Sequence, residues 1–124
     1  MPKIVERLVL KGIKGIAQNE IFYVQYGQIV NIGRASYCEI SYQKFKAYPK
    51  NEEEEPTLNI SREHLRISFF NTHSVQLKDL SSNGTFVNGR AIRKIFITDI
   101  FDKSYEIKLG PTETFLLSAE TVSK

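Results

Sequence analysis

The feature that most constrains this chain is that its apolar residues come in short, strand-like runs separated by turn residues. Runs such as IFYVQY at 21–26 and HLRISFF at 64–70 are rich in β-branched and aromatic residues, and no helical periodicity lasts three turns. Gly27 and the Gly110-Pro111 pair are turn signals between such runs. Many short strands at spacings of about 8–12 residues predict an all-β sandwich rather than alternating strands and helices.

The pattern also places individual strands. A first strand over 4–10 is expected at a sheet edge, because charged residues interrupt its apolar ones. Runs 21–26 and 29–32 are expected to pair as a hairpin, with Gly27-Gln28 as the connection. Further strands are predicted over 39–42, 58–60, 64–70, 74–80, 105–109 and 114–118. No helix is expected.

One stretch does not fit the strand pattern. Residues 43–57, QKFKAYPKNEEEEPT, carry two prolines and four consecutive glutamates without apolar periodicity, which predicts an extended acidic loop. The simplest interpretation is a solvated connection, and the alternative hypothesis is that the glutamates at 52–55 compete with weak ligands for a nearby basic site. Because 124 residues suit one domain, we expect a single, monomeric domain over 1–124.

Composition excludes several classes of protein. One cysteine, Cys38, allows no internal disulfide, and two histidines with one cysteine are too few for a structural zinc site, so we expect no metal, no cofactor and a reducing compartment such as the cytoplasm. The short apolar run near residue 8 contains charges, and no stretch approaches the length of a membrane span. A scattered net charge of +3 does not indicate nucleic-acid binding.

Polar turns at the predicted strand ends form a candidate binding site. They are Gly33-Arg34, Ser61-Arg62 and the run from Ser82 to Thr85. A guanidinium gives charge-assisted hydrogen bonds to phosphate oxygens, a hydroxyl adds a short one, and backbone N–H groups in glycine-containing turns can complete an anion pocket. Together these groups suit a dianionic phosphoryl group.

Three blocks carry a resemblance to a known family. GRASYCEI at 33–40, SREH at 61–64 and DLSSNGTFVNG at 79–89 resemble the signature blocks of the forkhead-associated (FHA) domain, in the same order. The resemblance covers about Leu8 to Leu117. It implies a sandwich of two mainly antiparallel sheets with about eleven strands, whose apical loops bind a phosphothreonine within an extended peptide of a partner protein.

The resemblance also implies roles for five binding residues. Arg34 is expected to pair with the phosphate, Ser61 to hydrogen-bond it, and Arg62 to contribute through its backbone or side chain. Asn83 is expected to hold the peptide main chain, and Ser82 to support the phosphothreonine end of the same loop. A small recess for the γ-methyl is implied as well, which favours threonine over serine.

Six further residues are expected to support the loops: Gly33, His64, Gly84, Thr85, Asn88 and Gly89. The resemblance implies that His64 ties the binding loops together by hydrogen bonds from beneath. Asn83-Gly84 and Asn88-Gly89 favour positive φ in tight turns, and the Thr85 hydroxyl can bond the loop backbone.

Two departures from the family pattern and two competing functions remain. Glu39 stands where the block usually has aspartate, and the connection from Arg34 to Ser61 is longer than usual. The sequence also allows an FHA-fold domain that binds proteins without phosphate. A hydrolase using Ser61 and His64 is the third interpretation. Because no third, orienting residue is evident nearby in sequence, we expect that the chain is not an enzyme.

Overall fold

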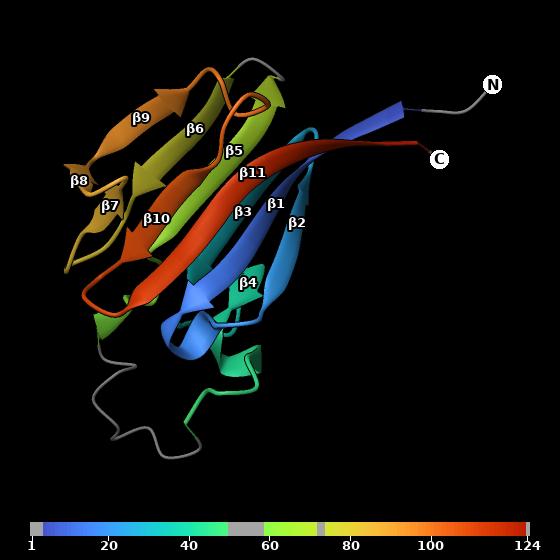
Figure 1. Ribbon diagram of the computed structural model, residues 1–124. Helices are drawn as coiled ribbons and strands as arrows, with labels where there is room; N and C mark the ends of the chain where they lie inside the picture. The colour runs from blue at the N-terminus through green and yellow to red at the C-terminus, as the bar shows by residue number, and fades with distance from the viewer. Residues whose placement is uncertain (1–3, 50–58, 72–73, 124) are drawn as a thin grey trace.

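The computed structural model describes residues 4–49, 59–71 and 74–123, in which eleven strands form two sheets packed face to face (Figure 1). In spatial order, the six-stranded sheet contains β2 (Ile21–Gln25), β1 (Ile4–Lys14), β11 (Glu113–Ser123), β10 (Tyr105–Leu109), β7 (Thr85–Val87) and β8 (Arg90–Ile92). The five-stranded sheet contains β4 (Ile40–Ser41), β3 (Gln28–Gly33), β5 (Leu65–Asn71), β6 (Ser74–Asp79) and β9 (Lys94–Ile97). The predicted all-β sandwich is confirmed.

Alternation along the strands builds the core between the sheets. Leu65, Ile67 and Phe69 on β5 are fully buried, as are Leu8 and Leu10 on β1 in the other sheet. Burying a side chain of this size contributes about 1.5–3 kcal/mol, so the two inner faces hold the layers together. Apart from the parallel pair β3–β4, neighbouring strands are antiparallel. The core fixes the strand ends from which the polar loops leave.

The prediction that the first strand lies at a sheet edge is wrong. β1 lies between β2 and β11, and both neighbours pair with it. Of the charges that suggested an edge, Arg7 lies on the outward side, where it forms a 2.7 Å ion pair with Glu120 and lies 4.0 Å from the centroid of the Tyr23 ring. Charged residues are therefore accommodated on a central strand because cross-strand neighbours partner them.

The predicted hairpin of 21–26 with 29–32 is also wrong. β2 pairs with β1 in one sheet, whereas β3 pairs with β4 and β5 in the other. The turn at Gly27, which has φ of 91°, carries the chain between the sheets, and its N–H donates to the Phe69 carbonyl at 2.6 Å. Two adjacent strand patterns do not reveal which partner each strand prefers.

Smaller differences concern short elements. Asn59 and Ile60 are not in a strand, contrary to the prediction for 58–60; Ile60 is buried in the core while the Asn59 carbonyl turns toward a neighbouring loop. The expectation of no helix is confirmed for the described residues, apart from two three-residue 3-10 turns, η1 (Gly15–Ala17) and η2 (Tyr42–Lys44), which are too short to leave a periodicity in a sequence. Most of the predicted acidic loop, 50–57, lies outside the described residues.

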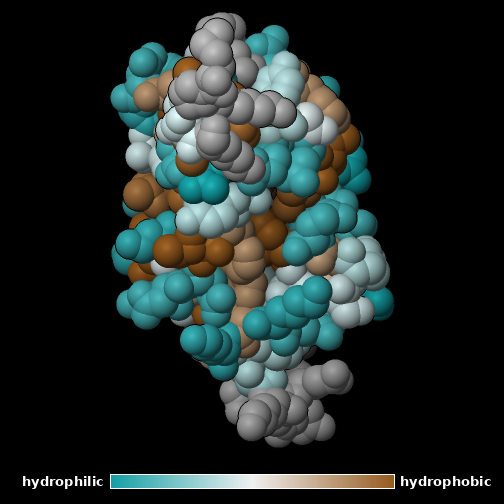
Figure 2. Space-filling model, turned by 90° about the vertical axis from the view of Figure 1, so that its right-hand side faces the viewer, coloured by the Kyte–Doolittle hydropathy of each residue, from teal (hydrophilic) through white to brown (hydrophobic). Residues whose placement is uncertain are grey.

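Two observations describe the surface. Neither 3-10 helix in the described residues has the length or apolar character needed to cross a bilayer. On the side where β2 and β4 form the sheet edges, hydrophobic residues gather across the middle of the surface, with hydrophilic residues around them (Figures 1 and 2). Ile21 on β2 and Ile29 on β3 are each 49% exposed.

Candidate functional site

Three segments meet at one end of the sandwich: the turn after β3, the segment before β5, and the loop between β6 and β7. Backbone hydrogen bonds extend the β3–β5 pairing into the first two segments. The Arg34 N–H donates to the Ser61 carbonyl and the Ala35 N–H to the Arg62 carbonyl, both at 3.0 Å. Arg34 and Ser61, which are distant in sequence, are therefore held next to each other.

Gly33 allows this close approach. A Cβ atom at this position would lie 2.1 Å from the carbonyl oxygen of Arg62, so a side chain would force the two backbone segments apart. The Cys38 thiol donates to the same carbonyl, with a distance of 3.2 Å from Sγ to the oxygen. The Arg62 backbone is therefore committed to holding the turn, while its side chain is exposed to solvent.

His64 links the segment before β5 to the loop that follows β6. It is fully buried; its Nδ1 accepts from the Ser61 N–H at 3.2 Å, and its Nε2 lies 2.9 Å from the Gly84 carbonyl oxygen. This pattern requires a neutral ring with the proton on Nε2. Burial lowers the pKa of His64 below its ordinary value, with the Gly84 hydrogen bond and the Asp79 charge opposing the shift, so the neutral form agrees with the geometry.

Asp79 organises the loop between β6 and β7. Its Oδ1 accepts from the Ser81 N–H at 3.1 Å, from the Ser81 hydroxyl at 2.5 Å and from the Thr85 hydroxyl at 2.8 Å. Burial alone would raise the pKa of Asp79, but the hydrogen bonds from Ser81 and Thr85 hold that pKa below its ordinary value. Thr85 was expected to bond the loop backbone and instead bonds this carboxylate.

The Arg34 side chain is partly exposed and donates no hydrogen bond to any other residue that the structure describes. Its Nε is buried and makes no hydrogen bond with the part of the chain that the structure describes. The Arg34 backbone, in contrast, is fixed on both sides, since its carbonyl accepts from the Gln43 Nε2 at 2.9 Å. The unmade hydrogen bond at this buried Nε costs about 1–3 kcal/mol, while the partly exposed side chain leaves its terminal N–H groups for an acceptor outside the protein.

Ser61 and Ser82 are in direct contact. The Ser82 N–H donates to Oγ of Ser61 at 3.0 Å, which occupies one acceptor position of that hydroxyl and fixes its oxygen. The hydroxyl proton of Ser61 remains available for an acceptor outside the protein. The geometry thus brings Ser61, Ser82 and the Arg34 backbone into one cluster.

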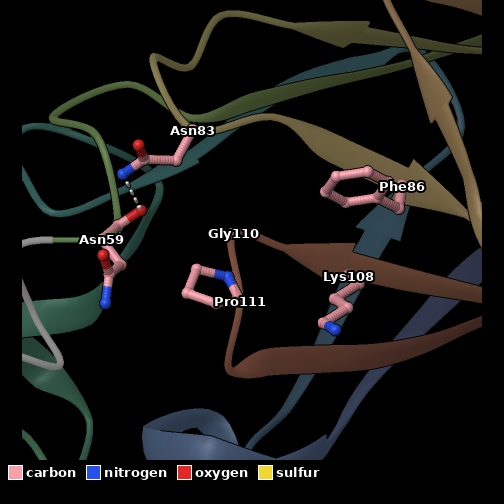
Figure 3. A pocket seen from close by; sticks show the side chains of 6 residues that line it. All are labelled: Asn59, Asn83, Phe86, Lys108, Gly110 and Pro111. Atoms are coloured by element: carbon pink, nitrogen blue, oxygen red, sulfur yellow. Dashed lines mark hydrogen bonds between the residues drawn. The ribbon is translucent and has the colours of Figure 1, made fainter.

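Asn83 lies beside a pocket of about 300 Å³ (Figure 3). Its Nδ2 donates to the Asn59 carbonyl at 3.2 Å, and these two residues form one side of the pocket (Figure 3). Phe86 and Lys108, which are register partners on β7 and β10, form the other side. Gly110 and Pro111, from the turn between β10 and β11, complete the lining. The pocket therefore combines an amide wall, an aromatic ring and a cation.

The structure does not bring all predicted residues to this end of the sandwich. Asn88 and Gly89 form the turn between β7 and β8, at the far end of β7 from Gly84. Their φ angles of 49° and 84° agree with the predicted positive values, and Gly84 has φ of 97°. Asn83 does not have a positive φ. Asn88 and Gly89 consequently support a hairpin rather than the loop cluster.

Sequence reasoning missed several residues at the site: Asp79, Ser81, Phe86, Lys108 and Pro111. For Asp79 a signal existed, because aspartate followed two residues later by serine is typical of a loop that bonds its own backbone. For Phe86 and Lys108 there was none, because their meeting depends on the register of two strands. Among the described residues, no cluster of three or more His, Cys, Asp or Glu side chains is placed to hold a metal.

Comparison with known families agrees with this geometry. The family model described as the FHA domain matches residues 30–110, which include every site residue predicted from the sequence. No curated protein sequence matches the chain. The resemblance of the three sequence blocks to this family is confirmed.

Solved structures share the fold. The FHA domain of the CT664 protein from Chlamydia trachomatis has a TM-score of 0.67 and 26% identity, with 90% of this chain and 96% of that chain covered. The FHA domain of an Arabidopsis thaliana hypothetical protein has the same TM-score and identity, with 90% and 84% covered. A structure titled for phosphothreonine-dependent FHA domain interactions has a TM-score of 0.63 and 23% identity, with 90% and 95% covered.

Proposed function

The chain belongs to the FHA domain family, and we propose that it is a phosphothreonine-dependent module that binds peptide segments of partner proteins. Domains of this fold are protein-interaction modules. The observation that carries the proposal is the Arg34–Ser61 pair, held together through the backbone while the Arg34 side chain bonds no described residue. Fixed backbones with unused side-chain donors are suited to recognise an anion.

The phosphate is assigned to Arg34 and Ser61. A phosphothreonine carries about −1.5 to −2 charges near neutral pH and presents three strong acceptor oxygens. The Arg34 guanidinium supplies charge-assisted hydrogen bonds, and the Ser61 hydroxyl, whose oxygen already accepts from Ser82, donates its proton. Arg62 adds its exposed charge at the rim. Binding should therefore weaken as salt concentration rises.

The peptide main chain is assigned to the loop between β6 and β7. Asn83 uses one N–H on the Asn59 carbonyl and keeps its amide oxygen and second N–H, which match the donor and acceptor of a peptide unit. Ser82 supports the phosphothreonine end through its bond to Ser61. His64 and Asp79 keep this loop in place without contacting the ligand.

The pocket beside Asn83 is assigned to a side chain that flanks the phosphothreonine. Lys108 places a cation on one wall, and in the described residues it has no acidic partner within ion-pair distance. Phe86 and Pro111 offer apolar surface for methylene groups. This combination favours an acidic flanking residue.

Titles of related structures support the proposal. One FHA structure is titled for phosphothreonine-dependent interactions, another is an FhaA FHA domain complexed with the intracellular domain of Rv3910, and a third is an engineered FHA with a Myc-pTBD peptide. We extend the same type of ligand to this chain. The free, buried Cys38 fits the further proposal that the domain works as a monomer in a reducing compartment such as the cytoplasm.

Calorimetric titration tests the proposal with three forms of one peptide, carrying phosphothreonine, phosphoserine or plain threonine. The phosphothreonine form should bind the wild type, and the plain form should not. The phosphoserine form should bind about fourfold more weakly, because one buried methyl contributes about 0.8 kcal/mol. Arg34→Ala should lose at least about tenfold in affinity, since hydrogen bonds to charged groups contribute about 1.5–3 kcal/mol.

Arg90→Ala is the matched control, because Arg90 is an exposed arginine beside the distant Asn88-Gly89 turn. It should bind the phosphothreonine peptide like the wild type. Equal affinity of the wild type for phosphorylated and plain peptides would overturn the proposal in favour of a phosphate-independent interaction domain. Unchanged binding by Arg34→Ala would remove Arg34 from the site.

A further inference from the structure

The outer face of the five-stranded sheet carries a basic row, made of Arg66, Lys78 and Lys94. Arg66 on β5 is the register partner of Lys78 on β6, which is also the partner of Lys94 on β9. The alternate positions on these strands are buried in the core: Ile67, Leu77 and Ile97. Since side chains of a strand alternate between faces, the three basic residues point outward side by side.

Stability does not account for the basic row. Residues directly opposite in antiparallel strands have Cβ atoms about 4.5–5.5 Å apart, and like charges at that spacing destabilise a sheet. The five strands of this sheet contain one acidic residue, Asp79, whose carboxylate is bonded to Ser81 and Thr85. In the described parts of the chain, none of the three basic side chains forms an ion pair. The three basic side chains therefore lie side by side without an ion pair in the described residues, although the Glu39 carboxylate accepts from the backbone N–H of Asn31, the register partner of Arg66, at 2.7 Å.

Arg66 is held in place for a further contact. Its Nε donates to the Asn31 amide oxygen at 3.0 Å, which orients the guanidinium and leaves its terminal donors for another acceptor. A planar guanidinium with free donors matches a carboxylate in two-point geometry. The basic row is consequently suited to acidic side chains.

A neutral row runs beside the basic row. It consists of Ile29, Ser68, Gln76 and Phe96, which are register partners across β3, β5, β6 and β9. Its two ends are apolar and exposed, with Ile29 at 49% and Phe96 at 61%. Cations beside exposed apolar side chains suit a polypeptide, which can supply both carboxylates and apolar contacts, better than a uniformly charged phosphate backbone.

The basic row lies directly behind the loops that hold the proposed phosphopeptide. Arg66 is four residues beyond Arg62, and Lys78 is four residues before Ser82. At about 3.3 Å per residue, four residues span at most about 13 Å, so an extended partner segment of about four residues is long enough to cover the separation. A partner segment anchored at the loops can therefore continue onto this face.

We propose that the basic row is a docking surface for an acidic segment of the phosphorylated partner, a few residues away from its phosphothreonine. This inference rests on the proposed function. Phosphate recognition selects the modified threonine, whereas the basic row selects partners with Asp or Glu on the adjoining stretch. Carboxylates at the row also remove the repulsion among Arg66, Lys78 and Lys94.

The test uses one phosphothreonine peptide extended on either side by a tail of four glutamates or of four glutamines. On one of the two sides, the glutamate tail should raise the affinity of the wild type about three- to tenfold over a glutamine tail at the same position at low salt. Lys78→Gln/Lys94→Gln should lose this gain, keep the affinity for the glutamine-tailed peptide, and melt at a slightly higher temperature. Lys11→Gln/Lys14→Gln, which removes the same charge from β1 in the other sheet, should keep the gain.

No gain from either glutamate tail, or an equal gain in all three proteins, would overturn the inference. The glutamine-tailed peptide with and without phosphate tests the proposed function separately. If phosphate proves irrelevant to binding, the docking surface is tested by itself with an unphosphorylated glutamate peptide and amide NMR shifts. Shifts at Arg66 and Lys78 support the docking surface, and their absence overturns it. Larger shifts there with a DNA oligonucleotide than with the glutamate peptide would also overturn it.

Discussion

The same dipeptide, Asn-Gly, occurs at both ends of β7 and serves two different purposes. Asn88-Gly89 is a two-residue hairpin turn in which both residues have positive φ. Its Asn88 exchanges hydrogen bonds with the backbone of Glu106 on the neighbouring strand, each at 2.8 Å. Asn83-Gly84 lies among long-range contacts instead: the Gly84 carbonyl accepts from His64 and from the Gly110 N–H.

The difference between the two Asn-Gly turns shows whether local or distant residues determine the conformation of a turn. At Asn88-Gly89 the turn chemistry of the dipeptide suffices, because Asn and Gly tolerate the left-handed region. At Asn83-Gly84 local bonds such as that from the Gly84 N–H to Oγ of Ser81 at 2.8 Å are joined by partners from distant parts of the chain, and Asn83 is left exposed with spare hydrogen-bonding groups. A loop held from below by tertiary contacts can present its upper side to a ligand.

Removing the tertiary support should have the largest effect. His64→Ala deletes a fully buried ring and both of its hydrogen bonds, so the free energy of unfolding should fall by about 3 kcal/mol. Urea denaturation measures that loss. Affinity for the phosphothreonine peptide should also fall at temperatures where the variant is still folded, because Ser61 and Gly84 lose their common partner.

A matched comparison is Arg90→Ala, which changes an exposed residue beside the Asn88-Gly89 turn and should leave the unfolding free energy within about 0.5 kcal/mol. Equal stability of His64→Ala and the wild type would mean that the loop between β6 and β7 holds its conformation by local bonds alone. The contrast between the two Asn-Gly turns would then disappear.

Acid should weaken the same support without a mutation. Burial lowers the pKa of His64, so near its ordinary value of about 6.5 the unfolded chain binds a proton that the folded protein does not. Stability is therefore full above about pH 6.5 and falls as the pH drops below it, by at most about 1.4 kcal/mol per pH unit. Asp79, whose pKa is also lowered, contributes stability that is lost only as the pH falls below its ordinary value of about 3.8.

Urea denaturation between about pH 7 and pH 5 isolates the contribution of His64, because Asp79 stays ionised in that window. His73→Gln removes the other histidine and should keep the pH dependence. A flat profile in the wild type, or one that His73→Gln abolishes, would show that His64 is not the group that titrates.

Much of the fold could be predicted from the sequence, because alternation and turn residues are local signals. Leu65, Ile67 and Phe69 alternate and are all buried, and the predicted turn at Asn88-Gly89 has positive φ. Strand partners could not be predicted: β2 and β3 follow one another yet join different sheets, because pairing is decided by packing of the whole core. The same limit explains why β1 was expected at an edge.

The site divides in the same way. Arg34, Ser61 and Asn83 could be named because they stand in short blocks with a family pattern, and the structure brings their backbones or side chains into neighbouring loops. The pocket wall of Phe86 and Lys108 could not, since those residues meet only through the register of β7 and β10. Sequence therefore locates the loops, while register determines what surrounds them.

The smallest expected effects on stability come from replacing the asparagine of each Asn-Gly turn with alanine, and they distinguish the two turns most clearly. Asn88→Ala puts alanine at a φ of 49° and removes the acceptor for the Glu106 N–H, so it should cost about 1 kcal/mol of unfolding free energy. Asn83→Ala removes one exposed 3.2 Å bond at ordinary φ and should cost less than about 0.5 kcal/mol.

Peptide binding should reverse that order. Asn83→Ala loses the amide assigned to the peptide main chain and should bind the phosphothreonine peptide about tenfold more weakly, whereas Asn88→Ala should bind like the wild type. The same substitution in two identical dipeptides thus separates stability from recognition. Calorimetry measures the peptide affinity, and urea denaturation measures the free energy of unfolding. If Asn83→Ala weakened the fold more than it weakened binding, Asn83 would be a structural residue and its exposed amide would have no part in holding a ligand.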